Sequence, residues 1–160
     1  MSDFDHKEKK LEEAIEYFLI ASGGYIRGDA NSFNKELALD TYTLLSFIKD
    51  TQPKQWAKYQ VIYGAESEKA FINRFCKEVK QVGLIHALRQ GITDRAIKFQ
   101  LAFFKPETQL NEQILKLYEQ NILSCTRQLY YSNRNNNSLD MVLFLNGIPI
   151  ITMELNPTFG

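Results

Sequence analysis

The stretch SLDMVLFLNGIPIITMEL, residues 138–155, predicts a β-hairpin around which the rest of the fold is arranged. Asn146-Gly147 is the strongest short-range signal for a tight turn between two strands. Apolar side chains occupy successive positions before and after the turn, so we expect both faces of the hairpin to be buried and the hairpin to lie centrally in a sheet. Pro149 has no N–H to donate, which places it at a strand start or at a bulge.

Two carboxylates stand at the far end of this hairpin, Asp140 on the first strand and Glu154 on the second. A two-residue turn would pair residue 145 with 148 and residue 140 with 153, which sends Glu154 to the face opposite Asp140. A three-residue loop or a bulge shifts the pairing by one residue and brings both carboxylates to one face. We therefore expect such a loop or bulge if the pair holds a divalent metal.

The two carboxylates could also be solvated residues at strand ends. Charges at one end of a buried hairpin are costly unless a partner or a cation compensates them, which favours a functional pair. Mg²⁺ takes one or two carboxylates and keeps several waters, so this pair suffices for a site. Such an ion would lower the pKa of a water molecule and balance charge on a phosphate during phosphodiester cleavage.

The whole chain predicts helices first and a small sheet second. Apolar periodicity predicts helices over residues 6–25, 34–50, 54–64, 66–83, 84–91 and 111–121. The first helix would bury a stripe of Leu11, Ile15, Phe18 and Leu19. Strands are expected over residues 97–105, 122–132, 138–146 and 148–155. With no internal repeat or linker, we expect a single domain over residues 1–160, of α/β (α+β-like) class, with a mixed, largely antiparallel central sheet flanked by helices.

The composition is that of an ordinary globular protein with no excess of either charge. The 160 residues contain 19 Lys and Arg and 19 Asp and Glu, a formal net charge of zero. Because neutralisation of phosphates supplies most nucleic-acid affinity, any DNA binding is expected to be weak, local or assisted by another domain. Two separated cysteines, no signal peptide and no long apolar run predict a reduced, cytoplasmic protein without a membrane partner.

Several ordered blocks of the sequence resemble one known family. They are LEEAIEYFL, GGY, ALD…LLSFIKDTQPKQW, FINRF, GLIHALRQGI, FQLAFFKP, LYEQNILSCTRQLYYS and NSLDMVLFLNGIPIITMELN, between Leu11 and Gly160. Together these blocks resemble the N-terminal nuclease domain of the restriction (R) subunit of type I restriction-modification enzymes. The resemblance implies an Asp…Glu-x-Lys nuclease-like fold that cuts duplex DNA with Mg²⁺.

Matching the family's motifs residue by residue gives a candidate site. Asp140 and Glu154 match the family's metal-binding carboxylates, so the resemblance implies that they are catalytic and hold Mg²⁺. Glu12 matches an acidic residue beside the metal in related nucleases, with a solvent-facing helix glutamate as the alternative. Arg127 and Gln128 match an Arg-Gln pair near the site, where Arg127 would contact a DNA phosphate or form a surface ion pair.

Two departures from the family pattern bear on activity. Asn156 stands at the usual lysine position of the Glu-x-Lys motif, so the site lacks an ammonium group to activate water and stabilise charge on the phosphate. The family's Gln-x-x-x-Tyr element and helicase-like motor domains do not follow, and no GxxxxGK[ST] motif is present, so ATP would act only through motor domains absent here. We therefore expect a C-terminally truncated, N-terminal fragment of an R subunit that binds Mg²⁺ weakly.

The sequence thus predicts the DNA-cleavage domain of a type I restriction enzyme R subunit, a Mg²⁺-dependent endonuclease module with little or no activity by itself. The family implies duplex DNA and the methyltransferase and specificity subunits as partners. One alternative is a non-catalytic fragment that serves only as a subunit-docking or structural module. Another is a general α/β binding domain, which a wide separation of Asp140 and Glu154 would favour.

Overall fold

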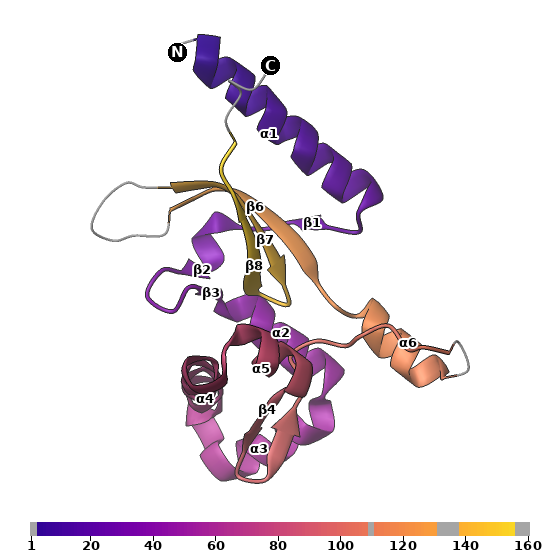
Figure 1. Cartoon of the computed structure of the whole chain (residues 1–160). Coiled ribbons are helices and arrows are strands. Elements are labelled where there is room, and N and C mark those ends of the chain that lie inside the picture. Colours follow the sequence, from indigo (N-terminus) through magenta and orange to yellow (C-terminus); the bar gives the residue numbers. More distant parts are fainter. Residues whose placement is uncertain (1–2, 109–110, 131–137, 156–160) are drawn as a thin grey trace. The chain divides into compact units, whose positions relative to one another are not determined.

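The computed structural model describes residues 3–108, 111–130 and 138–155 (Figure 1). Contacts within the chain divide it into two compact units. One combines Met1–Asp40 with Ile122–Gly160 and is called the sheet unit here, and the other, Thr41–Asn121, is called the helical unit. No helix of the described residues is long and apolar enough to cross a membrane. The single-domain organisation over residues 1–160 stays a prediction.

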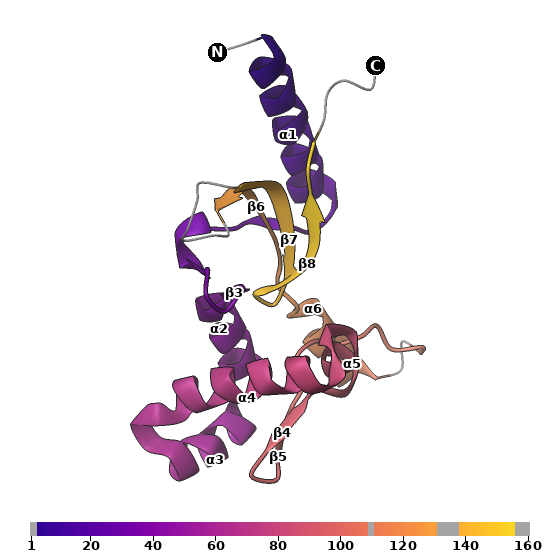
Figure 2. The ribbon, with the colours of Figure 1, turned by 60° about the vertical axis from the view of Figure 1, so that its left-hand side comes forward.

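The sheet unit is built on a mixed, largely antiparallel sheet, as the sequence predicts. Among the described residues its strand order is β1-β6-β7-β8 (Figures 1 and 2). The bounds are Ile26–Arg27 for β1, Leu123–Tyr130 for β6, Ser138–Leu145 for β7 and Ile148–Met153 for β8. β1 runs parallel to β6, whereas β6, β7 and β8 are antiparallel to their neighbours. The unit also holds α1 (Asp3–Ser22), the 3₁₀ turn η1 (Ala30–Ser32) and the short pair β2 (Phe33–Asn34) and β3 (Leu39–Asp40).

The β7–β8 hairpin has the predicted Asn146-Gly147 turn. Of the two irregularities that the sequence allowed, a three-residue loop or a bulge, it has the bulge. Asn146 and Gly147 form a two-residue turn with φ values of 52° and 79°, the left-handed conformation that a tight hairpin turn needs. Leu143 pairs with Ile151 but Phe144 pairs with Pro149, so Ile150 is the extra residue of the bulge. Pro149 therefore lies beside the bulge and near the strand start, as expected.

The predicted central position of the whole hairpin is wrong for its second strand. β7 lies between β6 and β8, but β8 is at the edge of the described sheet. Ile150 and Ile151 are 38% and 46% exposed, respectively. Apolar composition on both faces indicated burial, yet Pro149 and the bulge are features that sheets place at edges.

Helix α1 packs on one face of this sheet through a narrower stripe than the sequence predicts. Ile15 and Leu19 pack against the cluster of Cys125, Met141 and Leu143, but Leu11 and Phe18 are 40% and 66% exposed. The buried positions of the helix are instead 12, 15, 16 and 19, since Glu12 and Glu16 face the protein. The stripe is thus rotated by about one residue toward two glutamates, which apolar periodicity does not detect.

The face of the sheet opposite α1 packs against Phe33 of β2. Leu129, Val142 and Phe144 form its buried cluster, against which Phe33 and Leu139 pack. Phe33 meets the ring of Phe144 edge to face at 6.1 Å between ring centroids. Phe33 of β2 therefore covers part of this face of the sheet.

The helical unit surrounds an aromatic core. Its elements are α2 (Thr41–Thr51), α3 (Pro53–Tyr63), η2 (Gly64–Glu66), α4 (Ser67–Val82), α5 (Leu84–Gln90), β4 (Ile92–Asp94), β5 (Ile97–Phe99) and α6 (Glu112–Glu119). Phe99 of the β4–β5 hairpin contacts the rings of Trp56, Tyr59 and Phe71 at centroid distances of 6.2, 5.3 and 5.3 Å. Edge-to-face packing of this kind adds to the stabilisation from buried apolar area.

The sequence predicts the wrong length for one helix and one strand. The predicted helix over 34–50 begins only at Thr41, because Asn34 and Leu39 pair with each other in the β2–β3 ladder. The predicted strand over 97–105 ends at Phe99. Beyond it the backbone bonds to side chains, as the N–H of Gln100 donates to Gln52 and the N–H of Phe103 to Asn121.

Gln52 holds the start of α3 against the end of β5. Its side chain donates to the carbonyl of Gln100 at 2.9 Å and accepts the Gln100 N–H at 2.7 Å. Gln52 is 6% exposed, so water cannot readily replace these bonds. The contact fixes α3 and β5 as neighbours within the helical unit.

We expect Gln52→Ala to lower the free energy of unfolding by roughly 1–3 kcal/mol, because it leaves both backbone groups of Gln100 without their partner. Urea denaturation followed by circular dichroism would measure the change. The matched control is Gln55→Ala on the same helix, where the side chain is exposed and the expected change is within about 0.5 kcal/mol. Equal effects of the two substitutions would contradict this role of Gln52.

Candidate functional site

Asp140 and Glu154 lie at the same end of the β7–β8 ladder, just beyond its last pair. The last ladder pair is Met141 with Met153, and Asp140 and Glu154 are the next residues beyond it on the two chains. If the register continued by one more pair, the two residues would be directly opposite and would point to the same face. The bulge at Ile150 creates this register, which a regular two-residue hairpin would not have.

A hydrogen bond fixes the chain next to this pair. The N–H of Leu155 donates to Oδ2 of Asp140 at 2.6 Å. Asp140 is half-buried and Glu154 is exposed. The bond therefore ties the residue that follows Glu154 to Asp140, and it leaves the carboxylate of Glu154 accessible from solvent. Asn156 lies outside the described residues.

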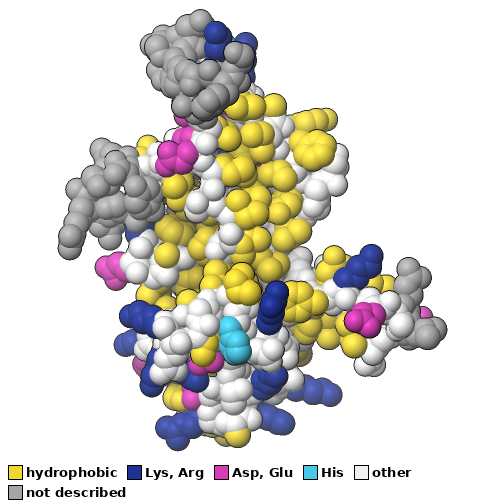
Figure 3. Space-filling model, viewed as in Figure 1, with side chains coloured by type: hydrophobic (Ala, Val, Ile, Leu, Met, Phe, Trp, Pro, Cys, Tyr) yellow, Lys and Arg dark blue, Asp and Glu magenta, His cyan; other side chains and the backbone are white. Residues whose placement is uncertain are grey.

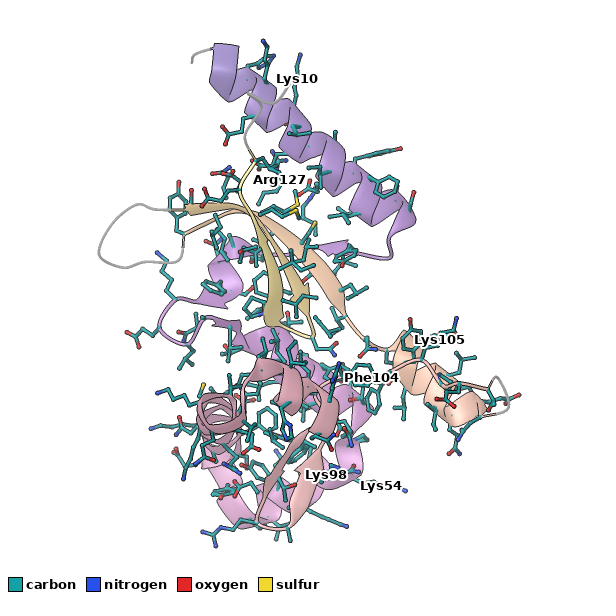
Figure 4. All side chains as sticks on the ribbon, in the orientation of Figure 1. Lys10, Lys54, Lys98, Phe104, Lys105 and Arg127 are labelled. Carbon is teal, nitrogen blue, oxygen red and sulfur yellow. The ribbon has the colours of Figure 1, made fainter. Side chains whose placement is uncertain are left out.

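Glu12 of α1 is buried against strand β6. Only 2% of its surface is exposed, which excludes the solvent-facing alternative. Nε of Arg127 donates to its Oε1 at 2.5 Å and Nε2 of Gln128 to its Oε2 at 2.8 Å (Figure 4 labels Arg127). Both carboxylate oxygens are thus engaged by side chains, and burial of the charge is compensated by the guanidinium.

An unusual backbone conformation lets two consecutive residues of β6 reach the same carboxylate. Successive side chains of a regular strand point to opposite faces, so Arg127 and Gln128 should diverge. Gln128 has a φ of 50°, in the left-handed region that non-glycine residues seldom adopt. Beyond it, Leu129 packs with Val142 on the sheet face opposite α1. The left-handed residue therefore changes the alternation of β6 at the point where Glu12 is bound.

Glu16 and Arg27 extend this network, and sequence reasoning missed both. Glu16 is 6% exposed, and its Oε1 lies 3.0 Å from the guanidinium of Arg27 and 3.7 Å from that of Arg127. Burial opposes the charge of Arg127, but the hydrogen bond with Glu12 and the charges of Glu12, Glu16 and Glu13 together raise its pKa. The spacing of Glu12 and Glu16, one helical turn apart, was the available sequence signal.

A hollow of about 410 Å³ lies beside this network in the sheet unit. Its lining residues are Glu12, Glu16, Arg27, Gly28, Ala30, Thr126, Arg127 and Gln128. Gly28 allows the close approach of its chain to β6, since its N–H donates to the Cys125 carbonyl at 2.8 Å and a Cβ there would meet Oγ1 of Thr126 at 2.2 Å. Two buried glutamates balance two arginines here, so the hollow carries little excess charge.

The donor set at the hairpin fits a divalent cation better than the network on α1 does. Asp140 and Glu154 would supply the one or two carboxylates that Mg²⁺ takes from proteins, and solvent would supply the remaining ligands. Glu12 already accepts two hydrogen bonds, so it would have to release Arg127 or Gln128 to bind an ion directly. No group of three or more His, Cys, Asp or Glu that could hold a metal occurs among the residues described. Contact of Arg127 or Gln128 with a DNA phosphate stays a prediction.

We expect Glu12→Ala to destabilise the protein by roughly 1–3 kcal/mol, because it leaves two donors and the charge of Arg127 without their acceptor. The control is Glu13→Ala on the same helix, whose side chain is 51% exposed and 3.9 Å from Arg127. Such an exposed pair contributes about 0–1 kcal/mol. Urea unfolding of both variants measures the difference, and an equal loss in both would contradict the buried network.

Comparison with known proteins agrees with the sequence resemblance. A search of curated proteins and a search of solved structures each found no match. The family model described as type I restriction enzyme R protein N terminus matches residues 7–158, nearly the whole chain. The chain therefore belongs to the family of type I restriction enzyme R protein N termini.

Proposed function

We propose that this chain is the DNA-cleavage module of a type I restriction enzyme R subunit, and that it hydrolyses phosphodiester bonds of duplex DNA with a divalent metal. The observation that supports the proposal is the bulged hairpin, whose register, if continued one pair beyond Met141 and Met153, would bring Asp140 opposite Glu154. Family membership supplies the DNA context. The methyltransferase and specificity subunits of a restriction complex are the proposed partners in the cytoplasm.

The roles of this chain's residues follow from their contacts. Asp140 and Glu154 would hold Mg²⁺, which when bound lowers the pKa of a water molecule and balances charge on the phosphate. The Leu155 N–H donates to Oδ2 of Asp140 and so positions this carboxylate. Glu12 orients Arg127 and Gln128 near the end of β6.

A non-catalytic role as a subunit-docking or structural module is the second candidate. Two observations favour it. Asn156 replaces the lysine of the Glu-x-Lys motif, and an amide supplies no positive charge opposite the phosphate. Glu12 is saturated by hydrogen bonds from the protein itself, as a purely structural residue would be. Metal binding at the hairpin separates this candidate from the first.

Calorimetric titration with Mn²⁺ tests the metal site directly. We expect weak binding by the unmodified chain and none by Asp140→Asn or Glu154→Gln, because each substitution removes one of two carboxylates. Asp140→Asn keeps an oxygen that can accept the Leu155 N–H, which limits structural damage. Glu36→Gln, at an exposed position of the sheet unit, is the control for a general loss of negative charge. Binding that all four proteins share equally would refute the site.

A plasmid-nicking assay tests catalysis separately from metal binding. We expect the unmodified chain to show little or no Mg²⁺-dependent nicking, since Asn156 brings no charge to the reacting phosphate. Glu154→Gln distinguishes nicking by this site from nicking by a contaminant. Robust Mg²⁺-dependent cleavage by the unmodified chain that is lost in Glu154→Gln would contradict the expected inactivity.

A further inference from the structure

Gln128 of β6 is a polar residue that lies across the ladder from Asp140 of β7. Apolar side chains predominate on the surface of the sheet unit that Figure 3 shows, so a polar side chain beside Asp140 is of interest. The ladder pairs on either side of the two residues are Arg127 with Met141 and Leu129 with Leu139. One residue of each strand stands between these pairs, Gln128 on β6 and Asp140 on β7. Residues placed in this way have Cβ atoms about 4.5–5.5 Å apart.

Gln128 and Asp140 both point toward the face of the sheet that α1 covers. The amide of Gln128 donates to Glu12 of α1, so its direction is given by a contact. On β7, Leu139 packs on the opposite face and Met141 on the α1 face, so the alternation of the strand changes between them. Asp140 is the residue at this change, as Gln128 is on β6. Because residues across a ladder share a face, Asp140 points the same way as Gln128.

The carboxylate of Glu12 fixes how the amide of Gln128 is oriented. The two ends of an amide differ, because its NH₂ donates hydrogen bonds and its carbonyl oxygen accepts them. A carboxylate only accepts, so the NH₂ must meet Glu12, and Nε2 of Gln128 lies 2.8 Å from Oε2 of Glu12. Glu12 is buried and also holds Arg127, which makes it a firm anchor. The carbonyl oxygen of Gln128 is therefore turned away from Glu12.

The carbonyl oxygen of Gln128 is directed at β7. Its Oε1 lies 3.4 Å from Oγ of Ser138, which is two residues before Asp140 on that strand. Ser138 and Asp140 flank Leu139, whose side chain is on the opposite face, so both belong to the α1 face. A hydroxyl group at this distance makes only a weak hydrogen bond, and Gln128 is exposed to solvent. The lone pairs of Oε1 are thus accessible on the face to which Asp140 points.

A carbonyl oxygen suits a cation site that already has two carboxylates. Mg²⁺ and Mn²⁺ take carboxylate oxygens, carbonyl oxygens and water as ligands. Asp140 and Glu154 would repel each other at short range, and a third carboxylate would add to that repulsion. A neutral amide oxygen adds a ligand without adding negative charge. The oriented Oε1 of Gln128 therefore has the chemistry that a further ligand at this hairpin needs.

We propose that Oε1 of Gln128 is a third protein ligand of the divalent cation, and that Glu12 is the residue that positions it. This inference rests on the proposed function, in which Asp140 and Glu154 hold the ion. It gives Gln128 a role toward the cation. It also gives Glu12 an indirect role, which it fulfils through its hydrogen bond to Gln128 without releasing Arg127 or Gln128.

Titration of the full chain with Mn²⁺, followed by the electron paramagnetic resonance signal of the free ion, tests the role of Gln128. Gln128→Met keeps the length of the side chain and removes the amide oxygen. Gln128→Asn suits the left-handed backbone, which keeps the fold, but its amide is one methylene too short to bond Glu12 and reach β7. Each variant should bind Mn²⁺ about tenfold more weakly. The matched control is Gln60→Met at an exposed position of α3, which should bind as the unmodified chain does.

A double-mutant cycle separates positioning by Glu12 from the general effect of its charge. Glu12→Gln keeps the shape of the side chain, but its amide donates as well as accepts, so it no longer fixes the orientation of Gln128. We expect Glu12→Gln to weaken Mn²⁺ binding in the unmodified chain and to have little further effect in Gln128→Met. An effect of the same size in both backgrounds would show that Glu12 acts only through its charge and would overturn its positioning role.

The outcomes distinguish this inference from the proposed function. If Asp140→Asn abolishes binding whereas Gln128→Met and Gln128→Asn bind as the unmodified chain does, Gln128 is not a ligand and the metal site stands without it. If Asp140→Asn leaves binding unchanged, the metal site itself is refuted, and the role of Gln128 with it. A two-dimensional amide NMR spectrum of the unmodified chain gives a measurement without substitution. Mg²⁺ should shift the side-chain amide signal of Gln128 and leave that of Gln60 in place, and an unshifted Gln128 signal would overturn the proposal.

Discussion

One extra residue in β8 determines on which side of the hairpin Glu154 lies. Without the bulge at Ile150, the Asn146-Gly147 turn would place Asp140 opposite Met153 and send Glu154 to the other face. With the bulge, Met141 pairs with Met153, and Asp140 and Glu154 follow at the same end of the ladder. The cost of an interrupted ladder is local, whereas its geometric effect extends to every residue that follows in the strand. Any chemistry at this hairpin depends on that shift.

The hairpin was the most predictable part of the structure because its signals are local. Asn146-Gly147 specifies the turn, and Pro149 together with the parity of two carboxylates indicated either a three-residue loop or a bulge, of which the structure has the bulge. The edge position of β8 was not predictable, because apolar residues on both faces indicate burial without saying what covers them. Strand order depends on contacts between distant segments, such as the parallel pairing of Ile26 with Ser124.

The network around Glu12 shows where sequence reasoning fails. Family resemblance indicated Glu12, Arg127 and Gln128 as residues near a site, but it did not indicate that they bond to one another. That contact depends on the left-handed backbone at Gln128, a conformation that glutamine rarely adopts and that no residue pattern predicts. Glu12 and Glu16 of α1 are buried whereas Leu11 and Phe18 are exposed, so the buried side of the helix differs from the one that its apolar periodicity predicts.

The position of β8 at the edge of the described sheet has a consequence for how this protein meets other chains. An exposed edge strand presents backbone N–H and C=O groups to which a foreign strand can pair, which promotes aggregation. In β8, Pro149 lacks an N–H and the bulge at Ile150 interrupts the regular spacing of the groups beyond it. A strand that approached this edge would therefore find no continuous ladder to extend. The residue that aligns Asp140 with Glu154 also protects the sheet from unwanted strand addition.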